Sequence, residues 1–224
     1  MKRIISVDGG KGGVGKSIIA MACLDTALTA GKKPLLIECD TTNPDVYKAY
    51  GEIIEAHAIE LTDKSGFLAL ASALHETNAE IVVINNPAGS NGWRTHGRLI
   101  ADNLGRIGGN LCTLWVANRQ QDALEILTSY HEVLPDVPVF FVMNLYWGTP
   151  SSFEIWQNSK LRMKFFQCGG GEICFPDCAD RVMHQIRTER LRWDQINSLP
   201  FGNLIEAERV RRLFTEILSP IIMK

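Results

Sequence analysis

Short runs of apolar residues alternate along the chain with longer segments in which apolar residues recur at a helical period. The runs contain few polar residues, which is typical of strands buried on both faces of a parallel sheet. They lie at residues 3–7, 34–39, 81–84, 111–117, 138–143 and 172–175. Helical patterns lie near residues 17–30, 66–77, 97–107 and 119–134. The alternation predicts an α/β doubly wound fold, with a mostly parallel sheet flanked by helices.

The last segment of the chain carries an apolar stripe at helical spacing. The stripe consists of Val210, Leu213, Phe214, Ile217 and Leu218. Because Glu216 lies beside it and Pro220 follows it, we expect it to pack against the domain rather than to lie on a membrane. The chain has no repeat and no linker rich in proline, glycine or serine, so residues 1–224 are predicted to form one domain.

Composition and charge narrow the function classes. The 46% hydrophobic and 21% charged residues exclude a disordered chain and a coiled-coil rod. A net charge of −2 argues against strong nucleic-acid binding by the whole surface. Residues 181–224 nevertheless carry three more basic than acidic side chains. The arginines within 181–212 fit a non-specific DNA contact, a protein docking patch or a solvated helix face.

The ends and the cysteines bear on the cellular compartment. The chain reaches glycine and charge by Asp8 and Gly9, too early for a secretory signal peptide. No apolar run approaches the ~20 residues of a membrane span. The six cysteines are therefore expected to be reduced, and the protein is expected to be cytoplasmic.

A glycine-rich loop follows the first predicted strand and opens the first predicted helix. Residues 10–17 read GKGGVGKS and fit the phosphate-binding pattern G-x-x-x-x-G-K-[ST]. Glycines let backbone N–H groups converge on phosphate oxygens, the lysine adds a positive charge, and the serine hydroxyl is a suitable Mg²⁺ ligand. The predicted nucleotide-binding residues here are Gly10, Gly12, Gly13, Val14, Gly15, Lys16, Ser17 and Ile18.

A second lysine, Lys11, narrows the pattern to K-G-G-x-G-K-[ST]. This loop resembles that of the ParA/MinD family of P-loop ATPases. The resemblance implies that two monomers close face to face around two ATP molecules, and that Lys11 of each contacts the phosphates held by the other. Considered without the resemblance, Lys11 could also be a solvated loop lysine.

The segment after the second predicted strand, from Glu38 to Asp45, resembles an acidic switch of this family. Asp40 matches the family acid that orients or deprotonates the attacking water, so the resemblance implies a catalytic role for Asp40 together with Lys11 and Lys16. Glu38 stands where the family usually has another aspartate. From the residues alone, Asp40 could instead cap a turn or helix.

The segment IVVINNPAG at residues 81–89 resembles the family strand that normally ends in an aspartate. That aspartate holds a Mg²⁺-bound water, and Asn85 occupies its position here. An amide can accept a hydrogen bond from such a water but adds no negative charge. The predicted metal site therefore consists of Ser17, with Asp40 and Asn85 acting through water, and the substitution predicts slow hydrolysis rather than loss of nucleotide binding.

Two further segments resemble the base-binding parts of the family and favour ATP over GTP. Asn144 follows the strand at 138–143 and matches an asparagine that contacts adenine, although it could also be a turn residue. Pro176, in the pair Phe175-Pro176, matches the second base-contact segment. The guanine-reading pattern N/T-K-x-D is absent after this strand.

Within the family, the chain is most similar to conjugal-transfer ATPases of the TraL type. The similarity lies in Asn144-x-Tyr146-Trp147-Gly148, in residues 189–195 and in the helix around Arg211. It implies an ATP-dependent homodimer that serves a protein partner in plasmid partition or conjugal transfer. Two alternatives remain: a nucleotide-binding scaffold that does not hydrolyse ATP, and a small-molecule ligase related to dethiobiotin synthetase, for which no substrate-site signature is found.

Overall fold

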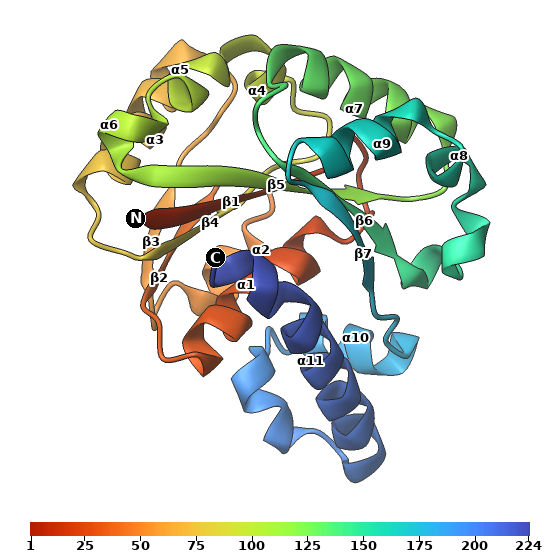
Figure 1. Cartoon of the computed structure of the whole chain (residues 1–224). Helices are drawn as coiled ribbons and strands as arrows, with labels where there is room; N and C mark the ends of the chain where they lie inside the picture. Colours follow the sequence, from red (N-terminus) through yellow and green to blue (C-terminus); the bar gives the residue numbers. More distant parts are fainter.

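The computed structural model describes residues 1–224, and a sheet of seven parallel strands forms its centre (Figure 1). The strands are β1 (Lys2–Asp8), β2 (Pro34–Glu38), β3 (Glu55–Ala58), β4 (Ile81–Asn85), β5 (Gly109–Ala117), β6 (Val139–Asn144) and β7 (Gly171–Phe175). Their order across the sheet is β3-β2-β4-β1-β5-β6-β7, and every neighbouring pair is parallel. The ends of β2, β4 and β1 therefore lie side by side at one edge.

Helices cover both faces of the sheet (Figure 1). On one face lie α1 (Lys16–Thr29), α2 (Asp45–Tyr50), α10 (Asp180–Thr188), the 3-10 turn η3 (Trp193–Ser198) and α11 (Phe201–Ile222). On the other lie α3 (Lys64–Glu76), α4 (Gly92–His96), α5 (Arg98–Ala101), α6 (Leu104–Ile107), α7 (Gln121–Val133), α8 (Glu154–Gln157) and α9 (Lys160–Gln167). Two 3-10 turns, η1 (Leu145–Trp147) and η2 (Pro150–Ser152), link β6 to α8. This is the predicted doubly wound α/β fold.

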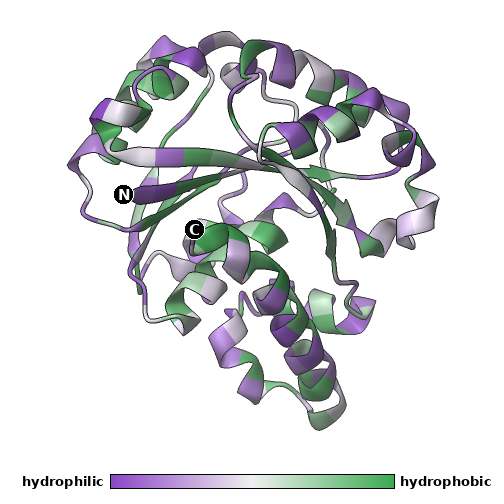
Figure 2. Cartoon of the chain, in the orientation of Figure 1, coloured by the Kyte–Doolittle hydropathy of each residue, from purple (hydrophilic) through white to green (hydrophobic).

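The apolar strands fill two cores because successive side chains of a strand point to opposite faces. In β1, Ile5 and Val7 lie in the core beneath α1 and α11, whereas Ile4 lies in the core beneath α3 and α7. All three are fully buried. Figure 2 shows hydrophobic residues along the strands and hydrophilic residues over the outer turns of the helices.

The predicted strands are confirmed within one or two residues, but the structure adds elements that the pattern did not indicate. The edge strand β3 is polar and mostly exposed, so it carries no apolar run. The predicted helix at 97–107 is divided into α5 and α6. At the break, the Asn103 side chain donates to the backbone oxygen of Leu99, a local bond that competes with the helix.

The C-terminal stripe packs inside the molecule, as expected. Helix α11 begins at Phe201, well before the stripe, and its Val210, Phe214 and Leu218 side chains are buried in the core beneath α1. Pro220 lies within the last turn of this helix. None of the helices combines the length and the apolar character needed to cross a membrane.

Candidate functional site

The loop between β1 and α1 turns tightly at the carboxyl edge of the sheet. Gly15, directly before α1, has a φ of 110°, a conformation that residues with a side chain rarely adopt. A Cβ atom at this position would lie 2.5 Å from the Asn144 amide nitrogen. That amide nitrogen donates a 2.7 Å hydrogen bond to the Val14 carbonyl, so Asn144 braces the loop from the end of β6. The loop conformation thus requires glycine at position 15.

Lys16 is the first residue of α1 and its side chain lies inside the loop. The Nζ atom donates to the Lys11 carbonyl at 2.9 Å and approaches the Gly9 carbonyl at 3.4 Å. Burial lowers the pKa of Lys16, while the charges of Asp8 and Asp40 act in the opposite direction. The buried ammonium is therefore positioned at the helix N-terminus, where it reinforces a site for anions.

Lys11 has a different environment from Lys16, because its side chain interacts with an acidic residue of the same chain. Its ammonium forms an ion pair with Asp122, in the first turn of α7. Both side chains remain partly exposed, at 35% and 45%. The lysine that the family resemblance places in a neighbouring active site is thus paired inside the single chain.

Glu38 and Asn85 meet where β2 and β4 end side by side. The two residues are paired in the sheet register, both are completely buried, and Asn85 Nδ2 donates to Glu38 Oε1 at 2.7 Å. The Glu38 carboxylate also accepts bonds from the backbone N–H groups of Asp40 and Tyr47. Burial raises the pKa of Glu38 to about 7 despite these bonds. Asn85 Oδ1 is buried without a hydrogen-bond partner.

Asp40 is half-buried and lies two residues beyond the end of β2, in the loop that follows this strand. Its carboxylate accepts a 3.2 Å hydrogen bond from the Asn43 backbone N–H. Together with Lys16 and Ser17 it lines a cavity of about 190 Å³. Carboxylate, ammonium and hydroxyl groups therefore face one space at the edge of the sheet. The structure brings these three predicted residues together.

A larger cavity of about 670 Å³ adjoins the first and shares Gly13, Gly15 and Ile18 with it. Asn144 and Pro176, from the ends of β6 and β7, line this larger space. The Asn144 amide oxygen accepts from the Tyr146 backbone N–H, in addition to the bond that its amide nitrogen makes with the loop. The predicted base-contact residues are thus adjacent to the loop, and Asn144 has a bracing role that its sequence position did not indicate.

Five predicted residues are not part of the lining of either cavity. They are Gly10, Lys11, Gly12, Val14 and Asn85. Val14 is buried and contributes the carbonyl that Asn144 binds.

The structure also reveals an acidic group that the sequence reasoning did not consider. Asp8 ends β1, next to Asn85 in the sheet order, and is 6% exposed. Its carboxylate accepts a hydrogen bond from the Gly9 N–H at 2.6 Å. Burial raises the pKa of Asp8 to about 6, and the positive charges of Lys16 and Arg94 oppose this rise. The sequence signal that could have identified Asp8 is its position as the last residue of the first strand, directly before the glycine loop.

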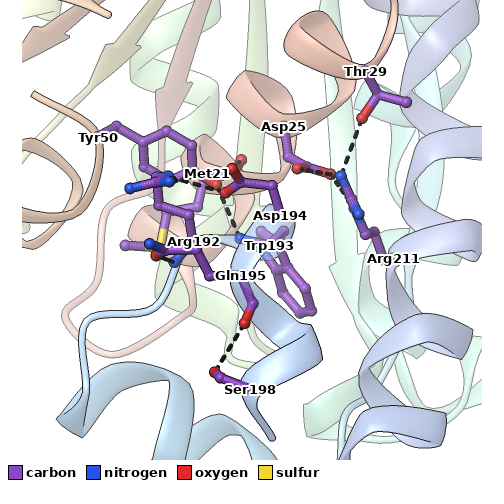
Figure 3. Close-up of polar contacts among 10 residues, drawn as sticks. All are labelled: Met21, Asp25, Thr29, Tyr50, Arg192, Trp193, Asp194, Gln195, Ser198 and Arg211. Carbon is purple, nitrogen blue, oxygen red and sulfur yellow. Dashed lines mark hydrogen bonds and ion pairs between the residues drawn. The ribbon is translucent and has the colours of Figure 1, made fainter. Parts of the chain in front are cut away.

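The arginines between residues 181 and 212 divide into paired and unpaired groups. Arg192, Arg209 and Arg211 form ion pairs with Asp194, Glu206 and Asp25, respectively. The Arg211 guanidinium bridges α11 to the buried Asp25 of α1 and also contacts Thr29 (Figure 3). Arg181, Arg187, Arg190 and Arg212 are exposed and form no ion pair, so only part of the predicted basic stretch is free for a ligand or partner.

Comparison with solved structures identifies the fold. A plasmid partition protein of Borrelia burgdorferi B31, solved with AMPPNP, superimposes with a TM-score of 0.59 at 15% identity, covering 97% of this chain and 100% of that one. The septum site-determining protein MinD of Pyrococcus horikoshii OT3, solved with Mg-ADP, also has a TM-score of 0.59, at 16% identity over 97% and 96% of the two chains. The fold is that of ParA/MinD-type P-loop ATPases.

Comparison of sequences adds a closer relative. No family model matches the chain. Protein MobD of Acidithiobacillus ferrooxidans, however, is 39% identical over 223 residues, which are 99% of this chain and 98% of MobD. Identity of this extent along both full sequences shows that the protein belongs to the family of MobD.

Proposed function

We propose that the protein is a nucleotide switch of the ParA/MinD type that binds ATP with Mg²⁺. The observation that carries the proposal is the grouping of Lys16, Ser17 and Asp40 around one cavity at the carboxyl end of a parallel sheet, where α/β proteins bind ligands. The adjoining cavity is of a size typical of small-molecule sites, roughly 300–1,000 Å³. It provides space for a base and ribose beside Asn144 and Pro176.

The polar groups behind the loop fit a magnesium ion. The Ser17 hydroxyl is the proposed direct ligand, with Asp40 and Asn85 acting through water. Asn85 Oδ1 is a buried acceptor without a partner, which suits a hydrogen bond from a metal-bound water. When bound, the ion would neutralise phosphate charge. Lys16 would contribute a second positive charge at the β- and γ-phosphates.

Hydrolysis is proposed to be slow, with Asp40 orienting or deprotonating the attacking water. Asp40 is suited to this because its side chain is half-buried and lines the phosphate side of the site. Asn85 lacks the negative charge that the family has at this position. Its amide is instead bonded to Glu38, whose pKa near 7 leaves this carboxylate only partly ionised at neutral pH.

Dimerisation is the proposed output of ATP binding. Residues 1–224 would act as one nucleotide-binding domain, and two copies would close face to face, with Lys11 of each binding the phosphates of the other. Because Lys11 is paired with Asp122 in the single chain, this exchange would replace an internal ion pair by a contact between subunits.

The proposed setting is the cytoplasm, where the dimer would serve the protein apparatus of conjugal transfer or plasmid partition. The relationship to MobD, the fold of a plasmid partition protein and the TraL-like segments support this setting. Non-specific DNA contact would fall to Arg181 and Arg212, the arginines of 181–212 that form no ion pair and line neither cavity. The buried stripe of α11 does not favour membrane binding.

A second function, a nucleotide-binding scaffold that does not hydrolyse ATP, is favoured by one observation. The position that normally carries an aspartate holds Asn85, and the neighbouring Glu38 is completely buried. In this case the dimer would form with ATP and dissociate only when the nucleotide leaves.

Calorimetric titration with Mg-ATP tests both functions at their common step. Lys16→Ala should abolish detectable ATP binding, because it removes the cation from the phosphate loop. Lys33→Ala is a matched control, since Lys33 is exposed and lines neither cavity. Unchanged affinity in the Lys16 variant would contradict nucleotide binding by this loop.

Phosphate release then separates the switch from the scaffold. Wild-type protein that dimerises with AMPPNP and slowly releases phosphate from ATP fits the switch. Dimerisation without any release, unaffected by Asp40→Ala, fits the scaffold. Analytical ultracentrifugation and a phosphate assay on the same sample provide the two measurements.

A further inference from the structure

The end of helix α10 approaches the glycine loop from the opposite side of the phosphate cavity. Arg187, in the last turn of α10, and Arg190, two residues beyond its end, line the 190 Å³ cavity together with Lys16 and Ser17. Arg187 also lines the larger cavity, so it stands where the two spaces join. Two arginines that are at least 170 residues from the loop in sequence therefore share its cavity.

The backbone holds Arg190 in an unusual conformation at this point. Its φ of 53° makes it the only non-glycine residue with a positive φ in the chain. The Leu191 N–H donates to the Ile186 carbonyl and the Arg190 N–H to the Arg187 carbonyl, the bonding pattern of a Schellman turn. Glycine is the residue usually found at this position of the turn. An arginine occupies this position despite the steric cost of its φ, and strained backbone of this kind is frequent at functional sites.

The guanidinium groups of both arginines are uncommitted. Neither side chain forms an ion pair or a hydrogen bond, in contrast to Arg192, Arg209 and Arg211 nearby. Asp40 and Asp45 also line the cavity, but their carboxylates accept bonds from Asn43 instead. The two arginines thus provide free positive charge on a wall that faces the loop.

Of the two lysines in the loop, only Lys16 has no acidic partner. Lys16 donates to backbone carbonyls and Lys11 is paired with Asp122. The position that would help to hold a divalent cation carries the neutral Asn85. A polyphosphate in this cavity therefore needs further positive charge, and the planar guanidinium fork suits phosphate oxygens better than an ammonium does.

We infer that Arg187 and Arg190 form a phosphate clamp, which binds the terminal phosphates of a nucleoside triphosphate from the side opposite the glycine loop. The inference rests on the proposed nucleotide-binding function and adds a second wall to that site. The arginines act within their own chain, unlike the role proposed for Lys11.

Calorimetric titration of Arg190→Gly, Arg187→Gln and the double variant with Mg-ATP and with inorganic tripolyphosphate tests the clamp. Each single variant should weaken binding of both ligands about tenfold, and the double variant more, because charge-assisted contacts are lost. Glycine suits the φ of residue 190, so Arg190→Gly should unfold at the same temperature as the wild type or higher. The matched controls are Arg181→Gln and Arg212→Gln, which remove exposed unpaired arginines outside both cavities.

The possible outcomes separate this inference from the proposed function. Clamp variants that bind ATP and tripolyphosphate as tightly as the controls would overturn the clamp. The same result with a loss of duplex DNA binding would also overturn it and assign the two arginines to nucleic acid. Wild-type protein that binds tripolyphosphate through Arg190 but does not bind ATP would overturn the nucleotide function, and the clamp would then bind polyphosphate without a nucleoside.

Discussion

Asn85 donates a 2.7 Å hydrogen bond to Glu38, and both side chains are buried where β2 and β4 end. The pair places an amide where the family resemblance predicts an acid, and an acid directly beside it. The acidic group at this edge of the sheet is thus Glu38 at the end of β2, whereas the family resemblance predicts an acid at the end of the neighbouring strand β4. Because of this hydrogen bond, the effect of the substitution Asn85→Asp depends on Glu38.

Asn85→Asp alone should improve Mg²⁺ binding less than its added charge suggests. The new carboxylate would lie within hydrogen-bond distance of Glu38, and two buried carboxylates this close share a proton. The double variant Glu38→Gln/Asn85→Asp exchanges amide and acid and keeps one charge. We expect it to lower the Mg²⁺ concentration for half-maximal ATP binding by about 5- to 150-fold, the effect of ~1–3 kcal/mol from one charge-assisted contact.

Phosphate release by the same variants provides a second measurement. The double variant should hydrolyse ATP faster than the wild type, and adding Asp40→Ala should abolish the gain while leaving ATP binding intact. Asn85→Asp that equals the double variant in both assays would show that Glu38 does not oppose the new charge. Wild-type turnover at ordinary enzyme rates would show that a carboxylate other than Glu38, such as Asp8 at the end of the neighbouring strand β1, supplies the missing charge.

The local parts of the site could be predicted from the sequence, and the contacts between distant segments could not. The glycine loop, Lys16 and Ser17 are encoded within eight residues, and Asp40 and Asn85 are marked by the apolar strands that precede them. The polar edge strand β3 has no apolar run to reveal it. Two features depend on how the helices pack against the sheet, and the spacing of residues in the sequence does not show this packing. They are the ion pair between Lys11 and Asp122 and the position of Arg190 at the cavity.

Glu38 and Asp8 should make the protein less stable as the pH rises from about 4 to about 8. Burial raises the pKa of these acids in the folded state, to about 7 and about 6, so the folded state binds protons more tightly than the unfolded state. Stability is therefore highest below the unfolded pKa values and is lost as the pH rises through the folded ones. For Glu38 the loss between pH 5 and pH 8 is about 2 kcal/mol.

The variant Glu38→Gln isolates this effect from all other titrating groups. Urea unfolding at pH 5 and pH 8 measures the free energy of unfolding of the variant minus that of the wild type. This difference should be about 2 kcal/mol larger at pH 8 than at pH 5, because only the wild type loses the contribution of Glu38. Thr41→Ser, an exposed change in the next loop, is the control and should show no such increase. A difference between variant and wild type that does not depend on pH would mean that Glu38 titrates normally.

The buried ion pair between α1 and α11 should be important for stability. The Asp25 side chain is 2% exposed, and Arg211 donates to both of its carboxylate oxygens (Figure 3). Arg211→Met leaves a buried carboxylate without its partner and should reduce the free energy of unfolding by about 3 kcal/mol. Asp25→Leu/Arg211→Met removes both charges and should recover much of the loss.

Urea unfolding of the two single variants and the double variant measures the coupling. Arg98→Met is the matched control, because it disrupts an exposed pair with Asp102 and should cost less than about 1 kcal/mol. Additive losses at Asp25 and Arg211 would show that the two residues stabilise the fold independently.

The ion pair between Lys11 and Asp122 should oppose dimerisation, because Lys11 must leave it to reach a second subunit. Asp122→Asn keeps the size of the side chain and removes its charge, so it should strengthen the AMPPNP-dependent dimer about two- to fivefold, the worth of an exposed ion pair. Lys11→Ala should leave AMPPNP binding largely intact and prevent the dimer.

Sedimentation equilibrium with and without AMPPNP measures both effects, and Glu125→Gln, one turn along α7, is the control. A dimer of unchanged affinity in Lys11→Ala would exclude the contact between subunits, and a weaker dimer in Asp122→Asn would show that the pair positions the loop instead of restraining it.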